Sequence, residues 1–142
     1  MILSIASVVL FTGCQNQQEV KNIEERISPK LMENRYNVAF LLMDGVYNTE
    51  FTAPFDIFQH TQYRKNIKAM NTFTVANTST ANTSFEGVRI LPDFNYTKDI
   101  LPKIDFLVIP GAAHPLESGL KAAVVLDYVK KVARGDRFLS SH

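Results

Sequence analysis

Two uninterrupted apolar runs constrain the fold of this chain more than any other feature of its sequence. The runs are YNVAFLLM, residues 36–43, and DFLVIPG, residues 105–111, and each has the length of a strand. Continuous apolar runs bounded by polar residues and glycine are typical of strands buried on both faces, in a parallel sheet covered by helices. The two runs therefore predict an α/β fold with a mainly parallel sheet.

A helix is predicted directly after the first run. Asn48 or Thr49 can cap its start, and Pro54 falls near its first turn, where proline is tolerated best. Its apolar face would consist of three phenylalanines at helical spacing, Phe51, Phe55 and Phe58. Strand, glycine turn and helix together begin an α/β unit.

A second, longer helix is predicted in GLKAAVVLDYVKKVARGD, with Gly135 ending it. Asp127 and Lys131 have the spacing of an i,i+4 ion pair on its exposed face. Its predicted buried stripe has six members: Ala122, Val125, Leu126, Val129, Val132 and Ala133. Short strands are predicted at 73–76 and 87–93, and RFLSSH, residues 137–142, enters a further strand.

The first fourteen residues, MILSIASVVLFTGC, read as a leader rather than as part of the fold. The apolar run is shorter than the roughly 20 residues that a membrane span needs, and it fits the core of a secretory signal. Its end resembles a bacterial lipobox, which makes Cys14 the expected lipidation site. The alternative is a buried strand with an incidental cysteine. The signal predicts that the protein is exported and anchored by lipid to a bacterial membrane. If the leader is not a signal, a cytoplasmic protein is expected instead.

The sequence divides into three parts: the signal (1–14), a polar tether (15–35) and a domain (36–142). The tether alternatively forms a short helix packed on the domain. With 142 residues there is room for one domain with a sizeable core. The net charge of +1 gives no reason to expect nucleic acid as a partner. One cysteine excludes a disulfide framework, and no HxH or HExxH spacing supports a metal, so neither metal nor cofactor is expected.

Candidate site residues follow the predicted strands, because sites in open α/β sheets form beyond the carboxyl ends of the strands. Glu50 stands in the first turn of the first helix, Gly111 and Ala112 offer backbone amides, and His142 marks a third loop. Each has a simpler interpretation. Glu50 can be a residue that complements the helix dipole, Gly111 part of an ordinary turn, and His114 a surface residue.

Three segments together resemble the ThiJ/PfpI superfamily, which has the class I glutamine-amidotransferase-like fold and includes the parkinsonism-associated deglycase family. They are VAFLLMDGVYNTEFTAPFDIFQ, SFEGVRILPDFNY and IDFLVIPGAAHP, within a resemblance that runs from about Asn37 to His142. It implies a flavodoxin-like three-layer sandwich with a nucleophilic cysteine on a sharp elbow, directly after a strand ending as RFLSSH does. On this interpretation the chain stops before the elbow and lacks the nucleophile.

The resemblance also implies roles for the candidate residues. The Glu50 carboxyl group would hydrogen-bond the cysteine sulfur and tune its reactivity, and the amides of Gly111 and Ala112 would hold an oxyanion. The family usually has a second glycine where Ala112 stands. His114 and His142 would lie just outside these groups.

The implied function is that of the N-terminal part of a cysteine-dependent hydrolase, hydratase or deglycase-like protein. It would act on a small carbonyl or amide compound, and a homodimer is a further expectation. The alternative function is a non-catalytic ligand-binding or sensor domain of the same fold.

Overall fold

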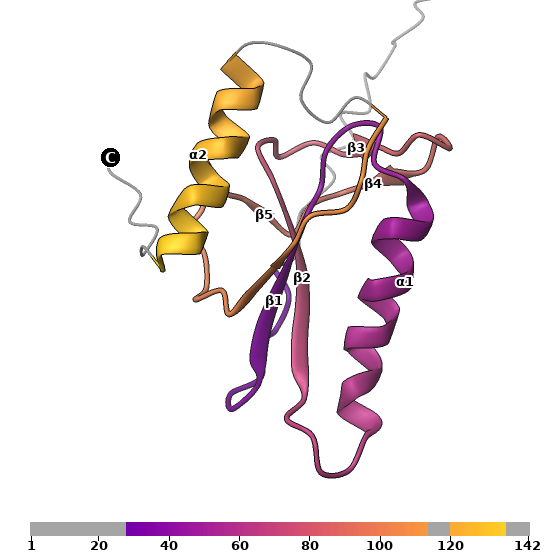
Figure 1. Ribbon diagram of the computed structural model, residues 1–142, viewed down its shortest axis with the longest axis vertical. Coiled ribbons are helices and arrows are strands. Elements are labelled where there is room, and N and C mark those ends of the chain that lie inside the picture. The colour runs from indigo at the N-terminus through magenta and orange to yellow at the C-terminus, as the bar shows by residue number, and fades with distance from the viewer. Residues whose placement is uncertain (1–27, 114–119, 136–142) are drawn as a thin grey trace, which may run out of the picture.

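A four-stranded parallel sheet forms the centre of the protein (Figure 1). The computed structural model describes residues 28–113 and 120–135. The strands lie in the order β5-β2-β1-β6, and every neighbouring pair is parallel. Their bounds are β1 Tyr36–Leu41, β2 Met70–Ala76, β5 Phe94–Asn95 and β6 Phe106–Val108. The predicted α/β class and parallel sheet are confirmed.

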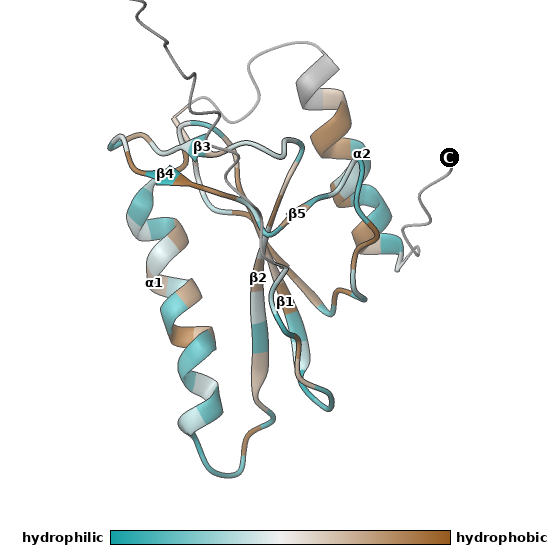
Figure 2. Cartoon of the chain, turned by 180° about the vertical axis from the view of Figure 1, so that it is seen from behind, coloured by the Kyte–Doolittle hydropathy of each residue, from teal (hydrophilic) through white to brown (hydrophobic). Residues whose placement is uncertain are grey.

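Helices cover both faces of this sheet. Helix α1 (Asn48–Gln59), continued by the 3₁₀ turn η1 (His60–Tyr63), lies on one side, and α2 (Leu120–Arg134) lies on the other (Figure 1). Both helices carry hydrophilic and hydrophobic bands, as expected of helices with one buried face (Figure 2). A small antiparallel hairpin, β3 (Asn82–Thr83) and β4 (Arg89–Ile90), lies outside the sheet. The three-layer arrangement is therefore also confirmed.

The core on the α1 side is centred on Phe40. Alternate residues of β1 point to this side, and Phe40 itself is fully buried. Its ring lies edge-on to three rings of α1, with centroid distances of 6.0, 5.0 and 6.0 Å to Phe51, Phe55 and Phe58. The predicted apolar face of the first helix is confirmed.

The core on the α2 side holds the other residues of β1, Ala39 and Leu41, against α2. The predicted stripe of α2 is partly wrong. Leu126 is 46% exposed, whereas Tyr128 is 2% exposed and stacks on Tyr96. The helical period explains the difference, since i, i+3, i+4 and i+7 from Val125 select 128, 129 and 132 and turn 126 away.

The remaining predictions for α2 and the segment after it are in part confirmed, in part wrong and in part outside the described residues. Ala133 is exposed, against the prediction, and the side chain of Ala122 lies outside the described residues. The ion pair between Asp127 and Lys131 is confirmed at 2.8 Å, and Gly135 ends the helix with a positive φ of 71°. The strand predicted at 137–142 lies outside the described residues.

The start of α1 differs from the prediction. Tyr47 is the N-cap and makes no side-chain capping bond, so neither Asn48 nor Thr49 caps the helix. Instead the Asn48 N–H donates to Glu86 Oε2 at 3.1 Å, which supplies an acceptor from the hairpin segment. Pro54 lies in the second turn rather than the first, and it lacks the N–H that would reach the Glu50 carbonyl.

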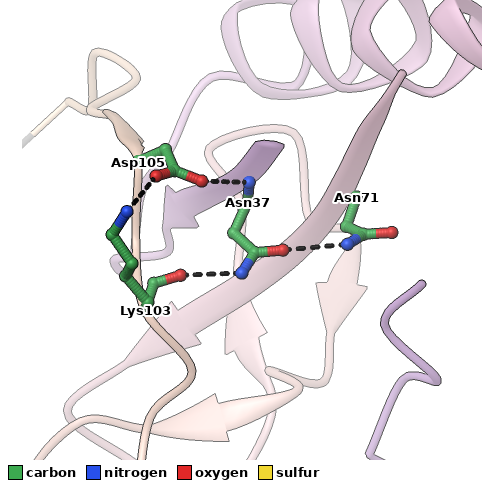
Figure 3. Close-up of polar contacts among 4 residues, drawn as sticks. All are labelled: Asn37, Asn71, Lys103 and Asp105. Carbon is green, nitrogen blue, oxygen red and sulfur yellow. Dashed lines mark hydrogen bonds and ion pairs between the residues drawn. The ribbon is translucent and has the colours of Figure 1, made fainter. Parts of the chain in front are cut away.

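A polar network joins the amino ends of the strands (Figure 3). Asn37 donates its backbone N–H to Asp105 Oδ2 at 2.9 Å and its side-chain amide to the Lys103 carbonyl at 2.8 Å. Asn71 Nδ2 donates to Asn37 Oδ1 at 2.8 Å, and Lys103 Nζ lies 3.0 Å from Asp105 Oδ1. These bonds tie β1 to β2 and to the loop that precedes β6.

We expect Asp105→Asn to destabilise the protein by about 0.5–1 kcal/mol at pH 7, the range of a partly exposed ion pair. The pKa of the Asp105 carboxyl lies below its ordinary value of 3.8, mainly because it accepts a hydrogen bond from the Asn37 N–H and secondly because it bonds with the Lys103 side chain. A lowered pKa in the folded state stabilises the fold above the unfolded-state pKa, and this stabilisation is lost as the pH falls through the folded-state pKa. Urea unfolding should therefore show the difference from wild type shrinking below about pH 4.

The matched control is Glu33→Gln, which neutralises an exposed carboxylate elsewhere. A difference between Asp105→Asn and wild type that stays constant from pH 7 to pH 3 would contradict the prediction.

Candidate functional site

Two loops meet at the carboxyl ends of β1 and β6. Val46, after β1, forms an isolated antiparallel bridge with Ala112, after β6, and both residues are buried. The Tyr47 N–H donates to the Gly111 carbonyl at 3.0 Å. This contact places the start of α1 directly beside the loop after β6, as expected for neighbouring parallel strands whose carboxyl ends share one edge.

Glu50 and Gly111, which are 61 residues apart, make direct contact across this junction. Glu50 lies in the first turn of α1, and its Oε2 accepts a hydrogen bond of 2.6 Å from the Gly111 N–H. An amide donating to a carboxylate is among the stronger protein hydrogen bonds. The structure thus brings together two of the residues that the sequence singled out, on an exposed surface that a ligand can reach.

Gly111 has no room for a side chain in this arrangement. A Cβ atom built there would fall on Glu50 Oε2, 3.0 Å from Glu50 Cδ and 3.1 Å from Oε1. The bond to Glu50 also engages the N–H that was expected to hold an oxyanion. A ligand oxygen would have to take the place of the Glu50 carboxylate to use that donor.

The hairpin segment holds the start of α1 in place. Besides the bond from Asn48 to Glu86, the Phe85 N–H donates to the Val46 carbonyl at 3.0 Å, and the Phe85 and Tyr47 rings lie 5.4 Å apart. Glu86 is a residue that sequence reasoning missed, because its partner lies 38 residues earlier and no local spacing indicates it. We assign it the role of positioning α1, and with it Glu50.

The remaining predicted site residues, His114, His142 and Cys14, lie outside the described residues. Within residues 28–113 and 120–135, no three His, Cys, Asp or Glu side chains lie close enough together to hold a metal ion. The candidate site within the described residues therefore consists of Glu50, Gly111 and Ala112, with Glu86 next to the start of the helix.

A sequence profile of the DJ-1/PfpI family matches residues 36–141, about three quarters of the chain. The chain belongs to the DJ-1/PfpI family. The suspected ThiJ/PfpI resemblance is confirmed by this match. Among curated proteins, none matches the chain significantly.

Solved structures of this family share the fold. Drosophila melanogaster DJ-1beta has a TM-score of 0.53 at 18% identity, and the match covers 72% of this chain and 52% of that one. A DJ-1 superfamily protein from Agrobacterium tumefaciens has a TM-score of 0.50 at 22% identity, covering 72% and 50%. A thiJ/pfpI family protein from Bacillus anthracis has a TM-score of 0.53 at 15% identity, covering 72% and 47%. The chain therefore spans about half the length of these DJ-1/PfpI structures.

Replacing Gly111 by Ala should break the contact with Glu50 at a small cost in stability. The new methyl group would displace the carboxylate, and the exposed Glu50 side chain can rotate into solvent. We expect the free energy of unfolding to fall by about 0.5–1.5 kcal/mol, the net value of one hydrogen bond. Urea unfolding measures the cost, and the amide resonance of residue 111 should lose its hydrogen-exchange protection.

The control for Gly111→Ala is the same change in a Glu50→Ala background, where no carboxylate is left to displace. There the change should cost nothing further. An equal cost in both backgrounds would show that the clash with Glu50 is not the cause.

Proposed function

We propose that this domain carries the acidic half of a cysteine-dependent site that acts on a small carbonyl or amide compound. The observation that supports it best is the Glu50 carboxylate, held at the carboxyl end of the sheet by the Gly111 N–H at 2.6 Å. Family membership suggests the partner group, a cysteine on a strand-to-helix turn.

Each group has a defined task in the proposal. A thiol reacts as its thiolate, and a turn that opens a helix stabilises the thiolate through the helix N-terminus. The Glu50 carboxyl group exchanges a proton with the sulfur or with the substrate, and its place in the first turn of α1 keeps it on a rigid element. Rotation of Glu50 away from Gly111 would free an N–H for the negative oxygen that forms when the sulfur attacks a carbonyl carbon.

The experiment is a turnover assay of the full-length protein in a Cys14→Ser background, with a panel of small 2-oxoaldehydes and primary amides. Turnover of at least one compound, abolished by prior treatment with iodoacetamide, is the expected result. Turnover that survives complete alkylation would overturn the cysteine mechanism. A folded protein with no turnover of any compound would favour the non-catalytic, ligand-binding alternative.

The leader supports a separate proposal, that Cys14 is lipidated after export to a bacterial membrane. Among the described residues, no helix combines the length and apolar character needed to cross a bilayer. We expect the full-length protein to fractionate with membranes and Cys14→Ser to release most of it into the soluble fraction. Equal distribution of the two proteins would refute lipid anchoring. The matched control is Ser7→Ala, which leaves the cysteine in place.

A further inference from the structure

An open groove of about 400 Å³ lies at the amino ends of the strands, at the opposite end of the sheet from Glu50. Its floor is the start of β2, residues 70–72. One wall is the segment 29–35, and the other is formed by Gln59 and Gln62 at the end of α1 and in η1. The volume is in the range of small-molecule sites. Nothing in the proposed chemistry at Glu50 uses this groove.

On the edge of β2 away from β1, no strand among the described residues pairs with Thr72, which lines the groove. At this edge the Met70 N–H donates to Thr61 Oγ1 at 2.9 Å, and the Thr74 N–H donates to Asp93 Oδ2 at 2.7 Å. Because main-chain groups alternate along a parallel strand, Thr72 between them presents its N–H and carbonyl to the same edge. Strand β5 pairs with β2 only from Val75 onward, so it does not cover this stretch.

The Thr72 side chain adds an unsatisfied polar group at the same point. Its hydroxyl oxygen is buried and has no hydrogen-bond partner among the described residues. A buried hydroxyl without a partner costs about 1–3 kcal/mol, a cost that a bound ligand would remove if the Thr72 side chain rotated its hydroxyl toward the groove. The groove floor therefore combines a main-chain donor with a hydroxyl group.

The charges around the groove have one sign. Arg35 and Lys30 line it, none of the lining residues is acidic, and the nearby Glu33 is exposed and is not among them. Within the part of the chain that the structure describes, neither cation forms an ion pair. A partly buried arginine whose planar guanidinium group is not engaged in an ion pair is suited to bind a carboxylate through two parallel hydrogen bonds. Apolar lining is present as well, at Leu31 and Met70 among others.

The groove is already formed without a ligand, because Asn71 holds the wall made by segment 29–35 in place. The Met32 N–H donates to Asn71 Oδ1 at 3.1 Å, and Asn71 Nδ2 donates to the Met32 carbonyl at 2.9 Å. The same Nδ2 donates to Asn37 in the network of Figure 3, which orients the Asn71 amide. Leu31 also packs against the core on the α2 side. The end of the segment predicted as a tether thus contacts the domain.

We propose that this groove binds a small organic carboxylate with an apolar tail. Arg35 and Lys30 would pair with the carboxylate, Thr72 would donate to it from the β2 edge, and the tail would lie along Leu31 and Met70. The arrangement supplies donors and positive charge without a competing acid, which excludes cationic ligands. A site of this kind, remote from Glu50, would let a metabolite acid influence the domain without entering the proposed reaction.

The test uses sodium hexanoate as the probe and the full-length, isotopically labelled protein. We expect saturable amide shifts at Thr72 and Arg35 with a dissociation constant of about 1–10 mM, the range for so small a ligand. Neutral 1-hexanol and sodium chloride at equal ionic strength should not reproduce them. Shifts that do not saturate, or that 1-hexanol produces equally, would overturn the proposal.

Two variants separate binding from folding. Arg35→Gln should weaken hexanoate binding at least about tenfold, whereas the matched change Arg89→Gln on the hairpin should leave it unchanged. Thr72→Val should weaken binding about threefold or more while the urea midpoint of the free protein stays equal or rises, because an unsatisfied hydroxyl is removed. Unchanged affinity in both groove variants would overturn the proposal.

Discussion

Replacing Glu50 by Gln should lower turnover by about 10²–10⁴-fold while leaving the fold intact. Glutamine keeps a side-chain oxygen that can accept the Gly111 N–H, so the contact between α1 and the loop after β6 should survive. Only the ability to gain and lose a proton disappears. Turnover of the compound identified in the alkylation assay measures the effect, and urea unfolding should show a change within about 0.5 kcal/mol.

The matched control for Glu50→Gln is Glu33→Gln, the same chemical change at an exposed position away from the site. It should leave turnover at the wild-type level. Turnover of Glu50→Gln within a factor of three of wild type would exclude an acid–base role for Glu50. The simpler interpretation of Glu50, as a residue that complements the helix dipole, would then be preferred.

Phe40→Ala should destabilise the protein by about 3–5 kcal/mol, the largest effect on stability that we expect of a single substitution. Phe40 is fully buried and contacts three phenylalanine rings of α1, at centroid distances of 5.0–6.0 Å. Removing its ring loses the transfer free energy and leaves a cavity between α1 and the sheet. This cost is a large part of the 5–15 kcal/mol that holds a typical domain folded.

Urea unfolding monitored by circular dichroism measures this effect. Phe40→Leu, which fills most of the space, should cost only about 1 kcal/mol and stay folded, so the comparison holds even where Phe40→Ala unfolds. Ile57→Ala, on the exposed side of α1, is the control and should cost less than about 0.5 kcal/mol. Equal costs for Phe40→Leu and Ile57→Ala would contradict the assignment of Phe40 to the core.

The sequence predicts well those elements whose buried positions follow from the local pattern of apolar and polar residues. Residues of β1 alternate between the α1 core and the α2 core, as Phe40 and Leu41 do, so residues 38–42 must all be apolar. The phenylalanines of α1 and the ion pair of α2 likewise follow from local spacing. Strand β2 was predicted too short, at 73–76, because Asn71 and Thr72 near its start carry polar side chains although they pair with β1.

What the sequence could not predict depends on contacts between distant residues. The strands β3 and β5 have two residues each, too few for a period to show. Of the site, Glu50 and Gly111 could be selected from their places after the strands, but their direct bond could not. Neither could the support of α1 by Glu86, nor the unsatisfied hydroxyl of Thr72, because both arise only when separate segments are packed together.

The asparagine network at the amino ends of the strands has a consequence for how the chain folds. Asn37 bonds with partners 34, 66 and 68 residues away, so the network is complete only after three distant segments have assembled. Such contacts come late, since the entropy of closing long loops must be overcome first. A slip of β1 by one residue would separate Asn37 from Asn71 and exchange the two faces of the strand. We therefore expect the network to form late in folding and to stabilise the correct alignment of β1 with β2, rather than to nucleate folding.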